Sequence, residues 1–155
     1  MKHPPIEICF DLSRSIDLHK ISTKQTGEEA IEGVTSGLIS LNETVTWRAK
    51  HFGVWQKLIT KITEYQRPIF FADEMVKGAF KAFRHEHHFE EIGEETLMID
   101  YFEFQSPFGI VGKLVNRIVL IEYMTNMLEI RNQVIKEAAE SDKWKELLNE
   151  TEIGW

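Results

Sequence analysis

The stretch that decides the fold runs from Gly109 to Ser141 and reads GIVGKLVNRIVLIEYMTNMLEIRNQVIKEAAES. Its apolar side chains recur at steps of three, four or seven residues, and polar residues such as Glu122 and Glu129 repeat on the other side. This period predicts one long amphipathic helix, about 45 Å in length at 1.5 Å per residue. The apolar positions are Ile110, Leu114, Leu120, Ile121, Met124, Met127, Leu128, Val134, Ile135 and Ala138. Because such a helix cannot bury its apolar side alone, we expect a curved sheet to wrap around it.

The chain between residue 43 and this helix is predicted to form an antiparallel sheet. Five segments there alternate between apolar and polar side chains or are rich in β-branched and aromatic residues. They comprise residues 44–50, 54–66, 69–77, 80–92 and 96–105. Because only short turns separate these segments, each strand should pair with the next in a meander, without parallel crossovers.

Shorter elements are predicted before residue 43. Residues 5–11 alternate between apolar and polar side chains and predict a first strand at the edge of the sheet. A serine can cap a short helix over residues 16–23, a glycine can end a second one over 28–33, and residues 37–41 predict a brief strand. The expected fold class is α+β, with a curved antiparallel sheet of about six to seven strands wrapped around a long C-terminal helix and two short helices after the first strand.

Composition argues against several classes of function. The 155 residues carry a net charge of −7 without a block of lysine or arginine, which argues against nucleic-acid binding. The single cysteine, Cys9, is expected to be a small core residue and cannot form an internal disulfide. There is no apolar signal segment at the N-terminus, and no apolar run approaches the roughly twenty residues that span a bilayer. We expect one cytoplasmic domain over residues 1–155 with a peripheral tail from about residue 142, a monomer or homodimer without integral membrane association.

Four ordered motifs resemble those of a known superfamily. They are FADEMVKGAF at residues 71–80, FRHEHHF at 83–89, TLMID at 96–100 and SPFG at 106–109. Together with the order of the elements, they resemble the START-like (SRPBCC) superfamily, in the patterns F-x-D-x-x-x-x-G-x-F, W-x-H-x-H-x-F, T-x-M-x-D and P-x-G. Within that superfamily, the match is similar to a bacterial subgroup often labelled a cell-division inhibitor.

This resemblance implies a helix-grip fold and a function like those of lipid-transfer, hydrophobic-ligand-binding and polyketide cyclase/dehydrase proteins. The match runs from about residue 45 into the last helix. Two positions depart from the family pattern, because Phe83 stands where tryptophan is common and Ala79 where proline is common. Neither departure removes a polar group from the cavity that is expected between sheet and helix.

Tight turns expected at Gly93-Glu94 and Gly78-Ala79 set the register of the last three strands. The turn at Gly93-Glu94 gives three inward pairs, His87 with Asp100, Phe89 with Met98, and His85 with Phe102. The turn at Gly78-Ala79 places Ala72 opposite His85 and Glu74 opposite Phe83, and it turns Asp73 outward beside Arg84.

The inner face would then be mostly apolar with a few convergent polar groups, which is what a small-ligand pocket requires. Its sheet residues are Phe70, Ala72, Glu74, Phe83, His85, His87, Phe89, Met98, Asp100 and Phe102. On the helix, Met124 and Met127 suit an adaptable lining, although methionine is also an ordinary core residue. Arg131 could bind a ligand carboxylate, or it could pair with a carboxylate of the sheet.

The histidine and aspartate side chains of this face allow several kinds of chemistry. His87 beside Asp100 could hold one tautomer and act as an acid/base pair, and Glu74 in an apolar wall could act as an acid. His85 and His87 could bind a metal together with Asp100, but nothing supplies an obvious third and fourth ligand, so we expect neither metal nor cofactor. The same groups could instead form a structural hydrogen-bond network.

Three functions are compatible with these patterns. The first is a carrier or sensor that holds a small hydrophobic molecule, lipid-like or aromatic, between sheet and helix. The second is a cyclase or dehydratase in which His87 and Asp100 are the acid/base pair and Glu74 or Tyr65 donates a second proton. The third is an interaction protein linked to cell division, whose cavity is filled core. The apolar inner face favours the carrier or sensor.

Overall fold

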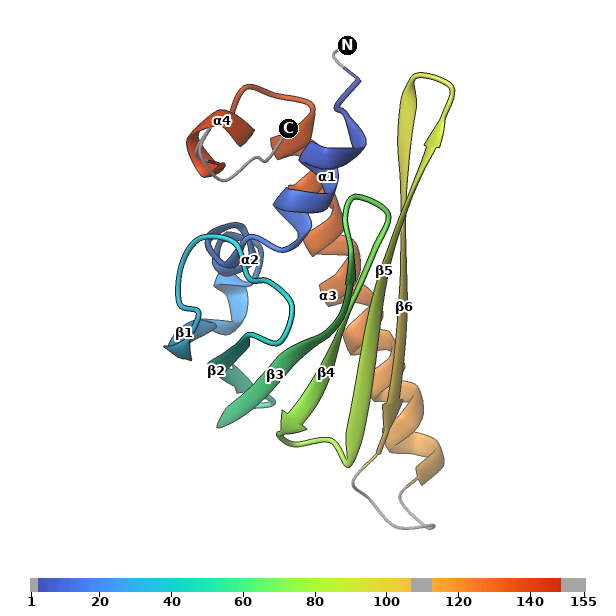
Figure 1. Ribbon diagram of the computed structural model, residues 1–155. Coiled ribbons are helices and arrows are strands. Elements are labelled where there is room, and N and C mark those ends of the chain that lie inside the picture. Colours follow the sequence, from blue (N-terminus) through green and yellow to red (C-terminus); the bar gives the residue numbers. More distant parts are fainter. Residues whose placement is uncertain (1–2, 107–112, 149–155) are drawn as a thin grey trace.

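The computed structural model describes residues 3–106 and 113–148. Figure 1 shows the arrangement of the elements, which follow one another along the chain with the bounds given next. They are α1 (Ile6–Ser13), α2 (Ile16–Ser22), the 3-10 turn η1 (Lys24–Thr26), β1 (Glu29–Gly33), β2 (Thr44–His51), β3 (Val54–Gln66), β4 (Phe70–Lys77), β5 (Ala82–Ile92), β6 (Glu95–Gln105), α3 (Lys113–Ala139) and α4 (Trp144–Leu147).

The six strands form one antiparallel sheet in which every strand pairs with its neighbour in the sequence, in the order β1 to β6. The sheet curves around α3, which crosses one of its faces from end to end (Figure 1). The predicted α+β fold class, with its curved meander and long C-terminal helix, is confirmed. No helix within the described ranges is both long enough and apolar enough to cross a bilayer.

Residues 5–11 do not form the predicted strand, because the segment is helix α1. Almost every side chain of α1 is buried, including Phe10, which has no exposed surface. Phe10 packs edge-on against Tyr65, Phe71 and Phe89 of the sheet. A helix enclosed on all sides has no polar face, so its sequence lacks the helical period and its short alternation resembled a strand. Cys9 is buried as expected, but within this helix.

The other elements before residue 43 agree only in part with the prediction. Helix α2 begins after Ser15, whose side chain accepts a backbone N–H of the helix as an N-cap should. The predicted helix over 28–33 is wrong, since β1 occupies this segment and pairs with β2. Gly33 has a φ of 78°, and a side chain there would collide with a backbone carbonyl of β2, so its role is close strand pairing. The predicted strand over 37–41 is reduced to one bridge between Ser15 and Leu38.

The two halves of α3 have different surroundings. Its C-terminal half enters the core through Ile135, Ala138 and Ala139, and α1 packs against this half. In its N-terminal half the predicted apolar positions Leu120, Met124, Met127 and Leu128 are only half-buried, and Ile121 is exposed. Two parts of the helix prediction lie outside what the structure describes. They are the predicted start at Gly109 and Ile110, and the side chain of Leu114.

The segment after residue 142 is not wholly peripheral. It forms α4, and the following residue, Leu148, is fully buried in the core beside α1. The prediction of a peripheral tail was wrong for this stretch, because a single leucine that fills a core position anchors it. The predicted frayed end, residues 149–155, lies outside the described residues.

Candidate functional site

A cavity of about 270 Å³ lies between the sheet and α3. Its walls are mostly apolar and come from the sheet and α3. Its polar lining includes Asp73, His85, His87 and Arg131, and also His51, whose Nδ1 atom lies 2.6 Å from the Tyr123 hydroxyl of α3. Of the residues predicted to bind a ligand, those that line it are Phe83, His85, His87, Phe102, Met124, Met127 and Arg131. The half-buried state of Met124 and Met127 is thereby explained, since they face a cavity and not a packed core.

Three predicted site residues, Phe70, Ala72 and Glu74, lie on the outer face of the sheet. The register of β4 and β5 places Asp73 opposite His85, one residue away from the predicted pairing. Residues 78–81 connect the two strands, so the turn is longer than the tight one we expected. A shift of one residue exchanges the two faces of a strand, which turned Asp73 inward and its neighbours outward. Glu74 contacts Arg84 on the outside of the sheet, so it is not placed to act as the acid that we predicted.

The register between β5 and β6 agrees with the prediction, with His87 opposite Asp100, Phe89 opposite Met98 and His85 opposite Phe102. Three of these inward residues still do not line the cavity. Phe89 packs in the core against Phe10 of α1, and the sulfur of Met98 accepts a hydrogen bond from the Ser13 hydroxyl at 3.3 Å. Helix α1 occupies this end of the inner face, and sequence reasoning had assigned that segment to the sheet. Asp100 does not line the cavity, but its Oδ1 atom contacts both histidines, which do.

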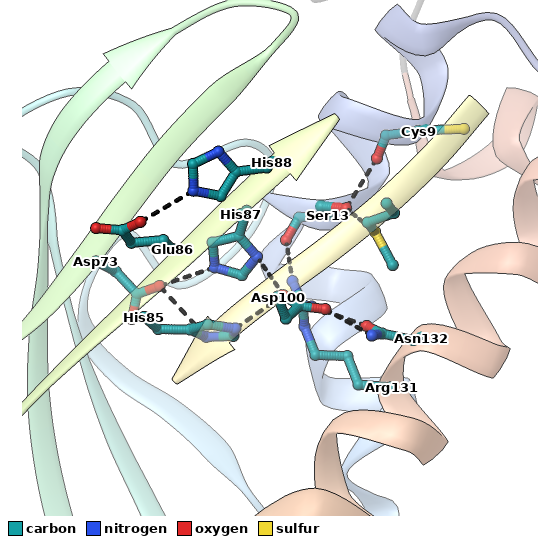
Figure 2. A network of polar contacts seen from close by, with 11 residues as sticks. Cys9, Ser13, Asp73, His85, Glu86, His87, His88, Asp100, Arg131 and Asn132 are labelled. Atoms are coloured by element: carbon teal, nitrogen blue, oxygen red, sulfur yellow. Dashed lines mark hydrogen bonds and ion pairs between the residues drawn. The ribbon is translucent and has the colours of Figure 1, made fainter. Parts of the chain in front are cut away.

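Four side chains meet at the polar end of the cavity (Figure 2). The Nε2 atom of His85 donates to Asp100 Oδ1 at 2.8 Å, and the Nδ1 atom of His87 lies 3.0 Å from the same oxygen, outside hydrogen-bond geometry. On the other side, Asp73 Oδ1 lies 3.0 Å from His87 Nε2 and 3.7 Å from His85 Nδ1. Each histidine is therefore placed between two carboxylates.

Helix α3 completes this group through Arg131 and Asn132. The Arg131 guanidinium lies 3.7 Å from Asp100 Oδ1 and donates to the backbone carbonyl of Ser13 at 2.7 Å. Asn132 donates to the second carboxylate oxygen of Asp100. The group thus links the sheet, α3 and α1. We call Asp73, His85, His87, Asp100 and Arg131 the polar cluster. The sequence did not predict that Asp73 belongs to the site, because the predicted register turned it outward. It did not predict the contact of Asn132 either, because Asn132 belongs to no motif.

Burial and close contacts within the polar cluster shift the pKa values of three of its side chains. Burial by itself would raise the pKa of Asp73 and of Asp100, but contacts with the histidines and with Arg131 outweigh it and lower both pKa values. Burial, reinforced by the neighbouring His87, lowers the pKa of His85 to about 4. At neutral pH two ionised carboxylates therefore face one guanidinium and a neutral His85.

Comparisons with known proteins bear on the fold. No family model and no curated protein matches the sequence. Among solved structures, TTHA0849 from Thermus thermophilus is similar over 90% of this chain and 94% of its own, with 15% identity and a TM-score of 0.67. The chain has the helix-grip fold.

Two further solved structures share the helix-grip arrangement. Major latex-like protein 151 from Panax ginseng has 14% identity and a TM-score of 0.61 over 88% of this chain and 90% of its own. Ara h 8.0201 has 12% identity and a TM-score of 0.56 over 87% and 92%. At such identities the likeness concerns the fold alone, so function has to be argued from the cavity and the polar cluster.

The helix-grip cavity can hold an apolar body and offer it polar partners at one end. Phe83 and Phe102 line the wall from the sheet, opposite the two methionines of α3. At the polar end, Asp73 offers an acceptor and Arg131 a donor. Tyr65, the other predicted proton donor, packs against Phe10 and does not line this cavity.

Proposed function

We propose that the protein binds a small, mainly apolar molecule in the cavity between sheet and α3, as a carrier or sensor. The observation that carries this proposal is an apolar cavity that ends at a buried polar cluster. Ligand pockets in proteins are usually apolar, with a small number of polar groups that orient the ligand. The volume of about 270 Å³ is near the lower end of the usual range of roughly 300–1,000 Å³, so the ligand should be small.

The two ends of the cavity imply an orientation for the ligand. Its apolar body would lie between the phenylalanines of the sheet and the methionines of α3, where unbranched methionine side chains can adapt to its shape. Its polar group would face Arg131 and Asp73. A ligand that desolvated the polar cluster without a hydrogen-bonding group would incur a penalty of about 1–3 kcal/mol per unpaired group, so the cluster should select for a polar group.

Native mass spectrometry of gently purified protein, followed by extraction and identification of any bound molecule, tests this proposal. We expect a stoichiometric apolar compound with one polar end. Added back at 100 times its Kd, it should stabilise the protein against unfolding by about 2.7 kcal/mol. An empty protein that no member of a panel of apolar ligands stabilises would contradict the proposal and favour the interaction role.

A pair of variants on α3 localises the binding. Met124→Trp places a large side chain in the cavity and should abolish the stabilisation by ligand. Thr125→Trp adds the same side chain at the next, exposed position and should leave it unchanged. Equal effects of both variants would mean that the ligand binds elsewhere.

A cyclase or dehydratase is the second candidate, and one observation favours it. His85 and His87 line the cavity with Asp100 behind them, which is the arrangement of an oriented general base. The test is whether the protein converts the extracted ligand into a product. If it does, and if a folded His87→Gln variant does not, the enzyme hypothesis replaces the carrier hypothesis.

A further inference from the structure

The inner face of the sheet brings together three side chains of the kinds that bind transition metals. One donor atom from each of Asp73, His85 and His87 can be chosen so that all three atoms lie within 4.8 Å of one another. They come from neighbouring positions of two paired strands, β4 and β5, so the sheet itself holds them in place. A tetrahedral metal with bonds of about 2.0–2.1 Å keeps its donor atoms about 3.3 Å apart. The separations of Asp73 Oδ1 from the two histidine nitrogens, 3.0 and 3.7 Å, bracket this value.

Asp100 determines which nitrogen of each histidine remains free. Its Oδ1 atom is hydrogen-bonded to His85 Nε2 and lies 3.0 Å from His87 Nδ1, outside hydrogen-bond geometry, and the negative charge of the carboxylate favours a proton on both atoms. The opposite nitrogens, His85 Nδ1 and His87 Nε2, then present lone pairs, and both face Asp73 (Figure 2). Histidine ligands of metal sites are usually oriented in this way, by a carboxylate or carbonyl on the nitrogen that does not bind the metal.

The contacts between described residues do not satisfy this group. His87 has only 2% of its surface exposed, and its Nδ1 atom has no hydrogen-bond partner among the described residues, although Asp100 lies beside it. Two carboxylates also face a single guanidinium. A proton on His87 Nε2 would satisfy one contact with Asp73, whereas a divalent cation would satisfy all three donor atoms and would be attracted by the carboxylates of Asp73 and Asp100.

We propose that Asp73, His85 and His87 bind one divalent transition-metal ion of the zinc or iron(II) type, with Asp100 orienting both imidazoles. Two imidazoles and one carboxylate favour such ions over magnesium and calcium, which prefer all-oxygen sites. Three protein ligands leave at least one coordination position open. All three ligands line the cavity, so the open position can face it.

This proposal departs from the sequence expectation of no metal. That expectation considered His85 and His87 with Asp100 and found no obvious further ligands, and the observed register now places Asp73 beside the two histidines. If the proposed function holds, the open position would receive an oxygen of the ligand, such as a carboxylate or a phenolate. The class of ligand would then be a small apolar molecule with one anionic oxygen group.

Metal titration of the full chain tests the site. Protein dialysed against EDTA and then freed of it should bind one equivalent of Co²⁺, with visible absorption bands that Zn²⁺ abolishes and excess Mg²⁺ does not. The imidazole NMR signals of His85 and His87 should shift with Co²⁺, while that of His88 should shift far less. A wild-type protein that shows neither the bands nor these shifts would overturn the proposal, whatever the variants do.

Matched variants on the two faces of the sheet separate this site from adventitious binding. Asp73→Asn and His87→Gln should weaken Co²⁺ binding by at least about 100-fold, and Asp100→Asn by about 10- to 100-fold. Glu86→Gln and His88→Gln remove the same types of side chain from the outer face and should leave binding unchanged. Circular dichroism shows which variants fold, and Co²⁺ binding that survives in folded Asp73→Asn, or that Glu86→Gln weakens equally, would contradict the site.

The metal and the ligand can fail separately. Stabilisation by an apolar ligand is therefore measured with Zn²⁺ present and again with EDTA. Co²⁺ binding without any ligand effect would leave the metal site standing and contradict the proposed function. Stabilisation by a ligand that persists in EDTA, in a protein that binds no Co²⁺, would support the proposed function and contradict the metal site.

Discussion

The two faces of β5 carry nearly the same chemistry in different surroundings. On the inner face His87 Nε2 lies 3.0 Å from a carboxylate oxygen of Asp73, and on the outer face His88 Nε2 lies 2.9 Å from Glu86. The His87 side chain is 2% exposed, whereas that of His88 is 35% exposed. Contact length therefore does not distinguish the two pairs, but access to water does.

Water changes what each pair contributes. On the outer face Arg84 contacts Glu64, Glu74 and Glu86, and its hydrogen bonds to Glu86 and Glu64 raise the pKa of its guanidinium. Such exposed pairs typically contribute about 0–1 kcal/mol each, because water and salt screen them. On the inner face, removal of one partner leaves another charge buried without compensation, which costs several kcal/mol. We therefore expect substitutions in the inner group to cost more stability than substitutions in the outer group.

The largest contrast between the faces should come from core packing. Phe89→Ala removes a buried ring that contacts Phe10 and Phe71, and should lower the free energy of unfolding by about 3–5 kcal/mol. Ile92→Ala, at an exposed position of the same strand, should change it by about 0.5 kcal/mol or less. Urea unfolding measures both, and similar losses would contradict the assignment of the inner face.

The next contrast concerns the carboxylates. Asp100→Asn withdraws a charge from His85, His87 and Arg131 and should cost about 3 kcal/mol of unfolding free energy. Glu86→Gln should cost less than about 1 kcal/mol. The comparison is made by urea unfolding in low salt, and it fails if Asp100→Asn proves as mild as Glu86→Gln.

The inner face should also make stability depend on pH. Protein kept in EDTA should lose stability as the pH falls from about 6.5 to 4, because His85 titrates near its ordinary pKa when unfolded and with a pKa of about 4 when folded. The unfolded state binds the proton first, so acid favours unfolding. The groups that face His85 are Asp73, His87, Asp100 and Arg131. Their contacts keep the carboxyl pKa values low, so a further loss should follow at lower pH.

The size of this effect is of the order of 1–3 kcal/mol over that interval. Urea midpoints at pH 7 and pH 4.5 measure it, and a folded His85→Gln variant should show a smaller difference between the two. An unchanged pH dependence in that variant would assign the effect to other groups.

The smallest effect is expected on the outer face. His88→Gln removes one half-exposed contact with Glu86 and should change the free energy of unfolding by no more than about 0.5 kcal/mol. Its ligand-induced thermal shift should equal that of the wild type. A large loss would mean that the outer face is covered in solution and that the contrast between the faces is weaker than we describe.

Local pattern and turn length account for the correct part of the prediction. The strands from residue 44 onward alternate because one face of the sheet is buried. In α3, by contrast, apolar side chains such as Ile118, Val119 and Ile130 are exposed, so burial of one face does not account for its whole apolar pattern. The register of β5 and β6 was correct because their turn is two residues long, from Ile92 to Glu95. A tight turn leaves only one way to pair the strands, so His87 and Asp100 could be paired from the sequence.

What the sequence alone determined is the fold class and one half of the polar cluster, since periodicity and a tight turn are local properties. The tertiary structure decided the rest. Only packing shows that residues 6–13 form an enclosed helix, and only the longer connection between β4 and β5 turns Asp73 toward His85. A change of one residue in that connection reverses which face each β4 side chain occupies, and no local pattern encodes it. Strand pairing in three dimensions therefore decided that Asp73 is the carboxylate that lines the cavity beside the histidines.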